Sequence, residues 1–240
     1  MRVNHAVYTA VIAMLAALPV LAVTPSWSYI NPSLSARGAG IHSACMMPAE
    51  ANLSKLGMKG REGMSKETDA WSTTLQTVVE SHLKLAGVEL KPVLPADTNA
   101  SDDELRQIVF RLQERYDGIS VKIKSKPKAI GKSRYTLGDE VALLPCASGA
   151  DVIVFVSGEG RVLTGGKKAF DWVLLGAGSP ISSGGSLVLS MADAKSGEIV
   201  AFVRLSNAGK FLNDSERAYG KALDKQFRKM RLGASGSRGK

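Results

Sequence analysis

The chain has 240 residues, of which 45% are hydrophobic and 22% are charged, and its formal net charge is +9. This composition is typical of a globular protein of one or two domains, and it excludes a disordered chain or a collagen-like fibre. The two cysteines and three histidines are too few for a zinc-finger cage or a disulfide-rich scaffold. They also leave little material for a metal enzyme or a catalytic triad.

Residues 1–28 have the three parts of a secretory signal peptide: a weakly basic start, the apolar segment Ala6–Val23, and small residues after it. We expect cleavage after Ser28, or earlier after Ala22. The alternative is an uncleaved anchor helix. In both cases the rest of the chain lies in the periplasm, in the outer envelope or outside the cell, so nucleic acid is not the expected partner of its basic charge.

Residues 29–65 show no sustained periodicity and are predicted to be an extended lead-in to an α/β domain over residues 66–232. Residues 69–86 are predicted to form a helix, because apolar side chains recur there at helical spacing. His82 falls on the apolar side of this helix, where we interpret a lone histidine as a packed or capping residue. A short strand is expected over residues 88–93.

A second helix is predicted to begin at Ser101, since Ser101 and Glu104 have the spacing of a capping box, and to end at Gly118. Residues 119–123 alternate between apolar and polar side chains, which predicts a half-buried strand. Six bases and no acid lie within Val121–Arg134. We interpret them as an exposed strand edge or, alternatively, as a contact for an anionic partner.

The almost unbroken β-branched run Val152–Val156 predicts a central strand buried on both faces, which Gly158 and Gly160 would end. Residues 186–191 and 199–205 are predicted to pair as a hairpin. Gly197, in the short connection between them, can adopt the positive φ that such a turn requires.

Cys45 and Cys146 are predicted to form a disulfide, because an exported chain with an even number of cysteines usually pairs them. Such a bridge would close a long loop and contribute about 4–5 kcal/mol on the chain-entropy model. The alternatives are two free buried thiols or one reactive thiol. Cys45 lies too far beyond the apolar segment to carry a lipid.

No motif singles out a catalytic or cofactor site. Gly160–Lys167 follows a predicted strand but lacks the lysine and hydroxyl of a phosphate-binding loop. The serines of residues 179–186 lie outside any nucleophile-elbow pattern. We therefore expect no metal or cofactor. An exported hydrolase with a serine from this loop is the alternative, which a serine beside His82 or His42 with an acid behind it would favour.

Residues 214–231 are predicted to form the last helix, followed by a flexible basic tail at 233–240. The apolar side chains of this helix would pack on the sheet, and its basic side chains would face outward. Together with bases of the earlier segment, this face is the candidate site for binding an anionic surface; the predicted residues are Lys221, Lys225, Arg228, Lys229, Lys122 and Lys124. The alternative is that these charges serve only solubility and the helix dipole.

The order of elements from about Thr68 to Leu232 resembles that of CsgG-type curli-secretion proteins and of the amino-terminal domain of TolB. The resemblance is carried by Leu85–Val88, by Ser148–Asp151 and the strand after it, and by the hairpin Leu189–Ile199. It implies an α/β sheet domain that mediates assembly in the bacterial envelope, without catalytic residues. The chain departs from CsgG-type proteins in lacking a lipidated cysteine, and a secretion channel is not implied.

We therefore expect one α/β (α+β) domain with a mixed sheet, an antiparallel hairpin and three or four amphipathic helices. The predicted function is that of a non-enzymatic, exported envelope protein with a binding or assembly role. Its expected partner is an envelope protein or an anionic membrane or polymer surface. The alternatives are the exported hydrolase and a module dedicated to binding an anionic surface.

Overall fold

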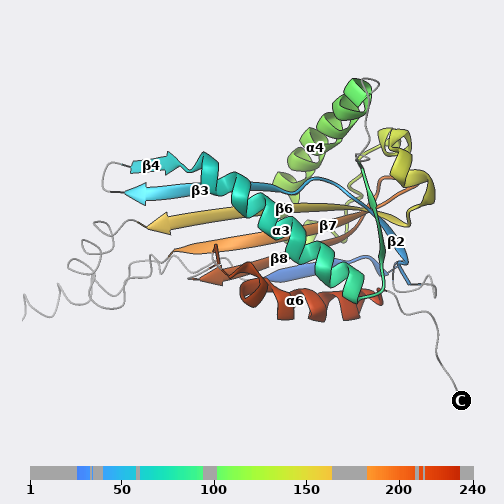
Figure 1. The fold of residues 1–240 in the computed structure, drawn as a ribbon. Helices are drawn as coiled ribbons and strands as arrows, with labels where there is room; N and C mark the ends of the chain where they lie inside the picture. The colour runs from blue at the N-terminus through green and yellow to red at the C-terminus, as the bar shows by residue number, and fades with distance from the viewer. Residues whose placement is uncertain are drawn as a thin grey trace, which may run out of the picture.

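The computed structural model describes residues 26–32, 34, 40–57, 60–93, 102–163, 183–208, 211, 212 and 214–232. Three α-helices and eight strands of this part of the chain form one α/β domain, as the sequence predicts (Figure 1). The strands are β1 (Trp27–Ile30), β2 (Ser43–Met46), β3 (Glu50–Gly57), β4 (Gly60–Gly63), β5 (Glu89–Pro92), β6 (Val152–Leu163), β7 (Gly184–Asp193) and β8 (Ile199–Ala208). The helices are α3 (Ser65–Leu85), α4 (Asp102–Ser125) and α6 (Ser215–Met230), with short 3-10 helices η1 (Pro127–Ala129), η2 (Asp139–Leu143) and η3 (Pro145–Gly149).

The sheet is mixed, with the strand order β1-β8-β7-β6-β2-β5. Neighbours β6 and β7, β7 and β8, and β8 and β1 are antiparallel. On its other side, β6 pairs in parallel first with β2 and then with β3, while β2 pairs in parallel with β5 and β3 forms a hairpin with β4. The long strand β6 is therefore central, as predicted for Val152–Val156.

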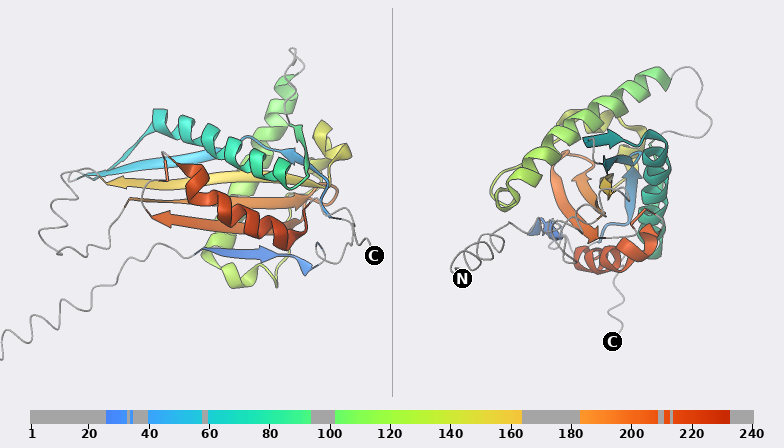
Figure 2. Two further views of the ribbon diagram at one scale, coloured as in Figure 1. Left: turned by 60° about the horizontal axis from the view of Figure 1, so that its bottom comes forward. Right: turned by 90° about the vertical axis from the view of Figure 1, so that its left-hand side faces the viewer.

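Helices cover both faces of the sheet (Figure 2). α3 and α6 lie on one face, and α4 crosses the other. Side chains of β6 alternate between the two cores: Val152, Val154 and Val156 pack under α3 and α6, whereas Ile153 and Phe155 pack under α4. Both faces of this strand are buried, as its β-branched run predicts.

The prediction that Gly158 and Gly160 end this strand is wrong, because β6 continues to Leu163. A Cβ at Gly158 would lie 2.5 Å from Cδ1 of Leu75 and 2.9 Å from the ring of Trp71. The glycine thus lets α3 pack directly on the backbone of β6, and strand pairing continues through it with β3 and β7.

α4 extends to Ser125, so the predictions that this helix ends at Gly118 and that residues 119–123 form a strand are wrong. Ile119 and Ile123 continue, at helical spacing, the buried stripe of Leu112 and Tyr116. Gly118 faces open space, where a glycine weakens a helix by about 1 kcal/mol without ending it. The bases that follow lie on and after a helix, not on a strand edge.

Residues 29–65 differ most from the sequence prediction, since strands β1 to β4 fall wholly or partly within this segment. Three of these strands have four residues each, which is too short for a hydrophobic pattern to be recognised. Residues 1–25, which hold most of the predicted signal peptide, lie outside the described residues. So do residues 164–182 and the predicted tail at 233–240.

Two predictions from local pattern are confirmed. α3 covers the predicted helix, and β7 and β8 form the predicted hairpin. In its turn Gly197 has φ of 67°, and Oδ1 of Asp193 accepts hydrogen bonds from the backbone N–H groups of Lys195 and Ser196 at 3.1 and 2.9 Å. The local chemistry of the turn therefore specifies this connection.

Candidate functional site

α6 is capped at both ends by its own sequence. Oδ1 of Asp214 accepts a hydrogen bond from the backbone N–H of Arg217 at 3.1 Å, and Arg231 ends the helix in the left-handed region with φ of 55°. These contacts satisfy backbone groups that a helix end leaves unpaired. The apolar side chains of α6 are buried against the sheet and α3, namely Tyr219, Leu223, Phe227 and Met230. The predicted helix over 214–231 is thus confirmed.

A buried imidazole joins α3 to α6. His82 of α3 is 5% exposed. Its Nδ1 lies 2.6 Å from Oδ1 of Asp224, and its Nε2 lies 2.7 Å from Oε1 of Glu216. Gly220 lies between these acids on α6, where a Cβ would be 2.9 Å from Nε2 of His82 and 2.6 Å from Oε1 of Glu216. The glycine lets the two helices approach closely enough for both contacts.

The two carboxylates determine the charge of this imidazole. Burial by itself lowers the pKa of His82, because it disfavours the charged form. The hydrogen bonds and negative charges of Glu216 and Asp224 outweigh this effect, and the pKa of His82 is raised above its usual value. An imidazolium donates through both nitrogens, which matches two carboxylate acceptors. The prediction that His82 is a packed residue is confirmed.

The acidic and the basic side chains of α6 lie on different sides of the helix. Glu216 and Asp224 face α3, whereas five bases are exposed: Arg217, Lys221, Lys225, Arg228 and Lys229. Each of the last four follows another of the five by three or four residues. This spacing places them on one side of the helix, and we call these five residues the α6 stripe. Four of them are predicted from the sequence. Arg217 was missed, although it precedes Lys221 by one helical turn.

The other two predicted binding residues lie elsewhere. Lys122 and Lys124 belong to α4, on the opposite face of the sheet from the α6 stripe (Figure 2). Lys122 is exposed. Lys124 is engaged, because its Nζ lies 2.6 Å from Oε1 of Glu159 and its side chain is only 19% exposed. The structure therefore does not join the two basic segments into one flat surface.

Serine catalysis has no support in the described part of the chain. There, no serine hydroxyl is hydrogen-bonded to a histidine ring, and both ring nitrogens of His82 contact carboxylates. Within residues 179–186, Oγ of Ser183 accepts a hydrogen bond from the backbone N–H of Leu163 at 3.1 Å, and Ser186 is buried. The other serines of that loop lie outside the described residues.

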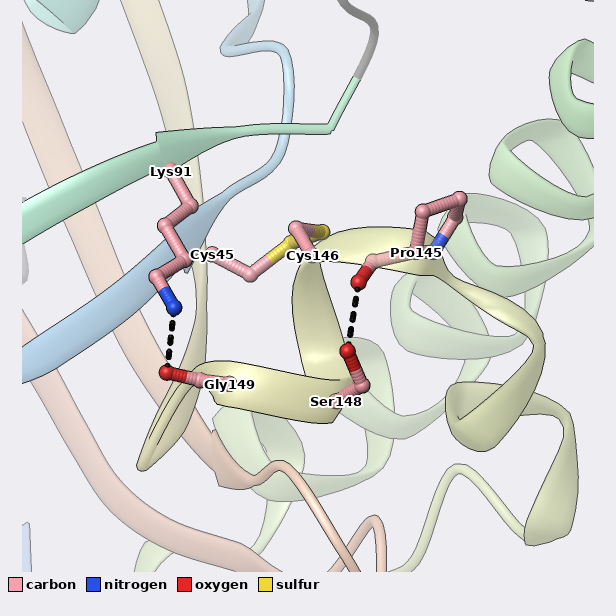
Figure 3. The surroundings of a disulfide bond; sticks show 6 residues. All are labelled: Cys45, Lys91, Pro145, Cys146, Ser148 and Gly149. Atoms are coloured by element: carbon pink, nitrogen blue, oxygen red, sulfur yellow. Dashed lines mark hydrogen bonds between the residues drawn. A yellow bond between two sulfur atoms is a disulfide. The ribbon is translucent and has the colours of Figure 1, made fainter.

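Cys45 and Cys146 form a disulfide, with their Cα atoms 5.5 Å apart (Figure 3). The bond links β2 to η3, and both cysteines are buried. Beside it, Nζ of Lys91 on β5 donates a hydrogen bond to the carbonyl oxygen of Gly149 at 2.6 Å. These contacts attach η3 to the edge of the sheet, which is a structural role.

No protein-family model matches the chain, and no curated protein matches it. Among solved structures it is similar to the PelC dodecamer from Paraburkholderia phytofirmans, at 12% identity over 86% of this chain and 96% of that chain, with a TM-score of 0.39. It is also similar to lipoprotein GNA1162 from Neisseria meningitidis, at 9% identity over 78% and 95%, with a TM-score of 0.30. A third is the LpoB C-terminal domain from Salmonella enterica, at 12% identity over 74% and 91%, with a TM-score of 0.27.

These similarities are too distant to assign a function. The resemblance to CsgG-type proteins and TolB is not shown by them and stays a prediction. In the described part of the chain, no helix has the length and apolar character needed to cross a membrane.

Proposed function

We propose that this chain is a non-enzymatic, exported envelope protein that binds an anionic surface through the α6 stripe. The observation that carries the proposal is the sorting of charge on α6. Two of its acids are turned toward His82, at 2.6 and 2.7 Å, and the exposed side keeps five bases. Charges that serve only solubility can lie on any side of a helix, whereas a surface that attracts anions needs bases without acids among them.

The expected strength follows from the number of bases. Each Lys or Arg held near an anionic membrane contributes about 1 kcal/mol, and the contributions accumulate over a cluster. Five bases on one side of a docked helix are therefore enough for reversible binding. Because the bases are exposed, salt should screen the attraction strongly.

Export is the second support. The predicted signal peptide takes the chain to a compartment with anionic lipids and polymers, and the Cys45–Cys146 disulfide suits an oxidising compartment. An exported protein does not meet the chromosome, so its basic face is better explained by envelope anions than by DNA.

The test is co-sedimentation with vesicles of zwitterionic lipid alone and of zwitterionic lipid with anionic phosphatidylglycerol. The wild type should bind only the anionic vesicles. A variant with Lys221, Lys225, Arg228 and Lys229 all replaced by Glu should lose this binding, because its stripe then repels the surface. Its circular dichroism spectrum should match that of the wild type, since all four side chains are exposed.

A matched control places the same four changes on the other face of the sheet. Lys122, Lys126, Lys128 and Lys132 are exposed on and after α4, so their replacement by Glu changes the net charge by the same amount. This control should still bind anionic vesicles. Vesicle binding by the wild type that the α6 variant retains in full, or a larger loss in the control, would contradict the proposed site.

A further inference from the structure

The most exposed large apolar side chain in the described residues lies beside the α6 stripe. Leu85, the last residue of α3, is 81% exposed, compared with 62% for Phe110 and 55% for Leu143. An exposed leucine is ordinary by itself. Its position is informative here because of the charges around it.

Leu85 is held next to α6 by the contacts of His82. His82 precedes Leu85 by one helical turn, and its ring contacts Asp224 in the middle of α6. The C-terminal ends of α3 and α6 lie side by side on the same face of the sheet (Figure 1, Figure 2). Arg228 is exposed one turn beyond Asp224, and Lys84 is exposed next to Leu85. Leu85 and Arg228 therefore each follow the His82–Asp224 contact by one turn of their own helix.

The acids of α3 do not disturb this surface. Glu80 accepts a hydrogen bond from Nε2 of Gln76 at 2.9 Å, and Oε1 of Gln76 accepts one from the backbone N–H of Ala49 at 3.0 Å. This chain of contacts turns Glu80 toward the segment between β2 and β3, away from α6. Asp69 lies more than three turns before Leu85 along α3. The other acids near this end of α3 are Glu216 and Asp224, which are half-exposed but paired with His82, and the exposed Glu89 of β5.

We propose that the C-terminal end of α3 and the α6 stripe together form a membrane-docking face, in which Leu85 enters the lipid while the bases contact anionic headgroups. The inference rests on the proposed function and names its partner as a lipid bilayer. A soluble anionic polymer offers charge but no apolar layer, so it gives an exposed leucine nothing to bind. The strength of binding at a membrane surface increases both with the apolar area that is buried and with the electrostatic attraction to anionic lipids.

The test compares vesicles with a soluble polyanion. Leu85→Gln should weaken binding to phosphatidylglycerol vesicles about tenfold, the loss expected when one leucine no longer leaves water. The same variant should bind dextran sulfate as the wild type does. Leu143→Gln, a matched change on η2 at the other face, should leave both affinities unchanged. Because Leu85 and Leu143 are exposed, both variants should keep the wild-type unfolding temperature.

A second variant reports insertion directly. The emission of Leu85→Trp, corrected for the native tryptophans, should shift to shorter wavelength with anionic vesicles and stay unchanged with dextran sulfate. Unaltered vesicle affinity in Leu85→Gln, or no shift in Leu85→Trp, would overturn the membrane inference. Binding of the wild type to dextran sulfate but not to vesicles would overturn it and leave the proposed function standing. Binding to neither would overturn both.

Discussion

Replacing His82 with Gln tests whether the imidazole holds α6 on α3. The substitution removes the contacts of Nδ1 with Asp224 at 2.6 Å and of Nε2 with Glu216 at 2.7 Å. Hydrogen bonds between charged groups contribute about 1.5–3 kcal/mol each. The side chains of Glu216 and Asp224 are 60% and 46% exposed, so water screens them and rehydrates them in the variant. We expect a total cost of roughly 2–3 kcal/mol near pH 6.

The cost should depend on pH with a definite sign. The pKa of His82 is raised in the folded protein above its value in the unfolded chain, because the contacts with Glu216 and Asp224 outweigh the effect of burial. Such a group contributes its full stability below the unfolded pKa of about 6.5 and loses it as the pH rises through the folded pKa. One proton limits the change to about 1.4 kcal/mol per pH unit.

The assay is urea unfolding of the oxidised wild type and of His82→Gln at about pH 6 and about pH 9. The difference between their free energies of unfolding should be larger at the lower pH. His42→Gln is the matched control, because His42 is exposed, and it should change stability by less than about 0.5 kcal/mol. A His82→Gln cost that is constant with pH, or that grows toward pH 9, would refute the reasoning.

Gly118→Ala should raise the free energy of unfolding by about 1 kcal/mol, because Gly118 is helical and faces open space; a lower value in urea unfolding would contradict this. Gly158→Ala should lower the free energy of unfolding by about 1–3 kcal/mol, since a Cβ there meets two side chains of α3 at 2.9 Å or less. Unchanged stability would contradict this, because it would mean that α3 can move away without cost. Replacing Cys45 and Cys146 together with Ala should lower the urea midpoint, at a cost of up to about 4–5 kcal/mol, and an unaltered midpoint would refute this. Mass spectrometry of the exported protein should show cleavage after Ala22, because this cut leaves β1 whole; a mature chain that begins within β1 would contradict the expectation.

The sequence predicted correctly those helices and strands that are specified by residues close together in the chain. α6 was predicted from its apolar spacing, and the β7–β8 hairpin from its turn around Gly197. Gly158 and Gly118 misled the prediction for opposite reasons. Gly158 is required by a helix packed on the strand, which is a tertiary contact, whereas Gly118 is simply tolerated in a long helix that packing elsewhere stabilises.

The candidate site was predicted only in part. The bases of α6 could be placed on one face from their spacing, and a complete helical projection would have added Arg217. The contacts of His82 with Glu216 and Asp224 could not be predicted, because they join residues 134 and 142 positions apart. The exposure of Leu85 could not be predicted either, since the helical spacing of apolar residues does not show where along α3 the burial of its apolar face ends.

The most direct test of the central claim is the salt dependence of vesicle binding by the unmodified, oxidised protein. Binding to phosphatidylglycerol vesicles should be strong at about 0.05 M salt and nearly absent at about 0.5 M, because exposed charges are screened at that ionic strength. Binding that is unaffected by salt, or equal on zwitterionic vesicles, would contradict an electrostatic role for the α6 stripe.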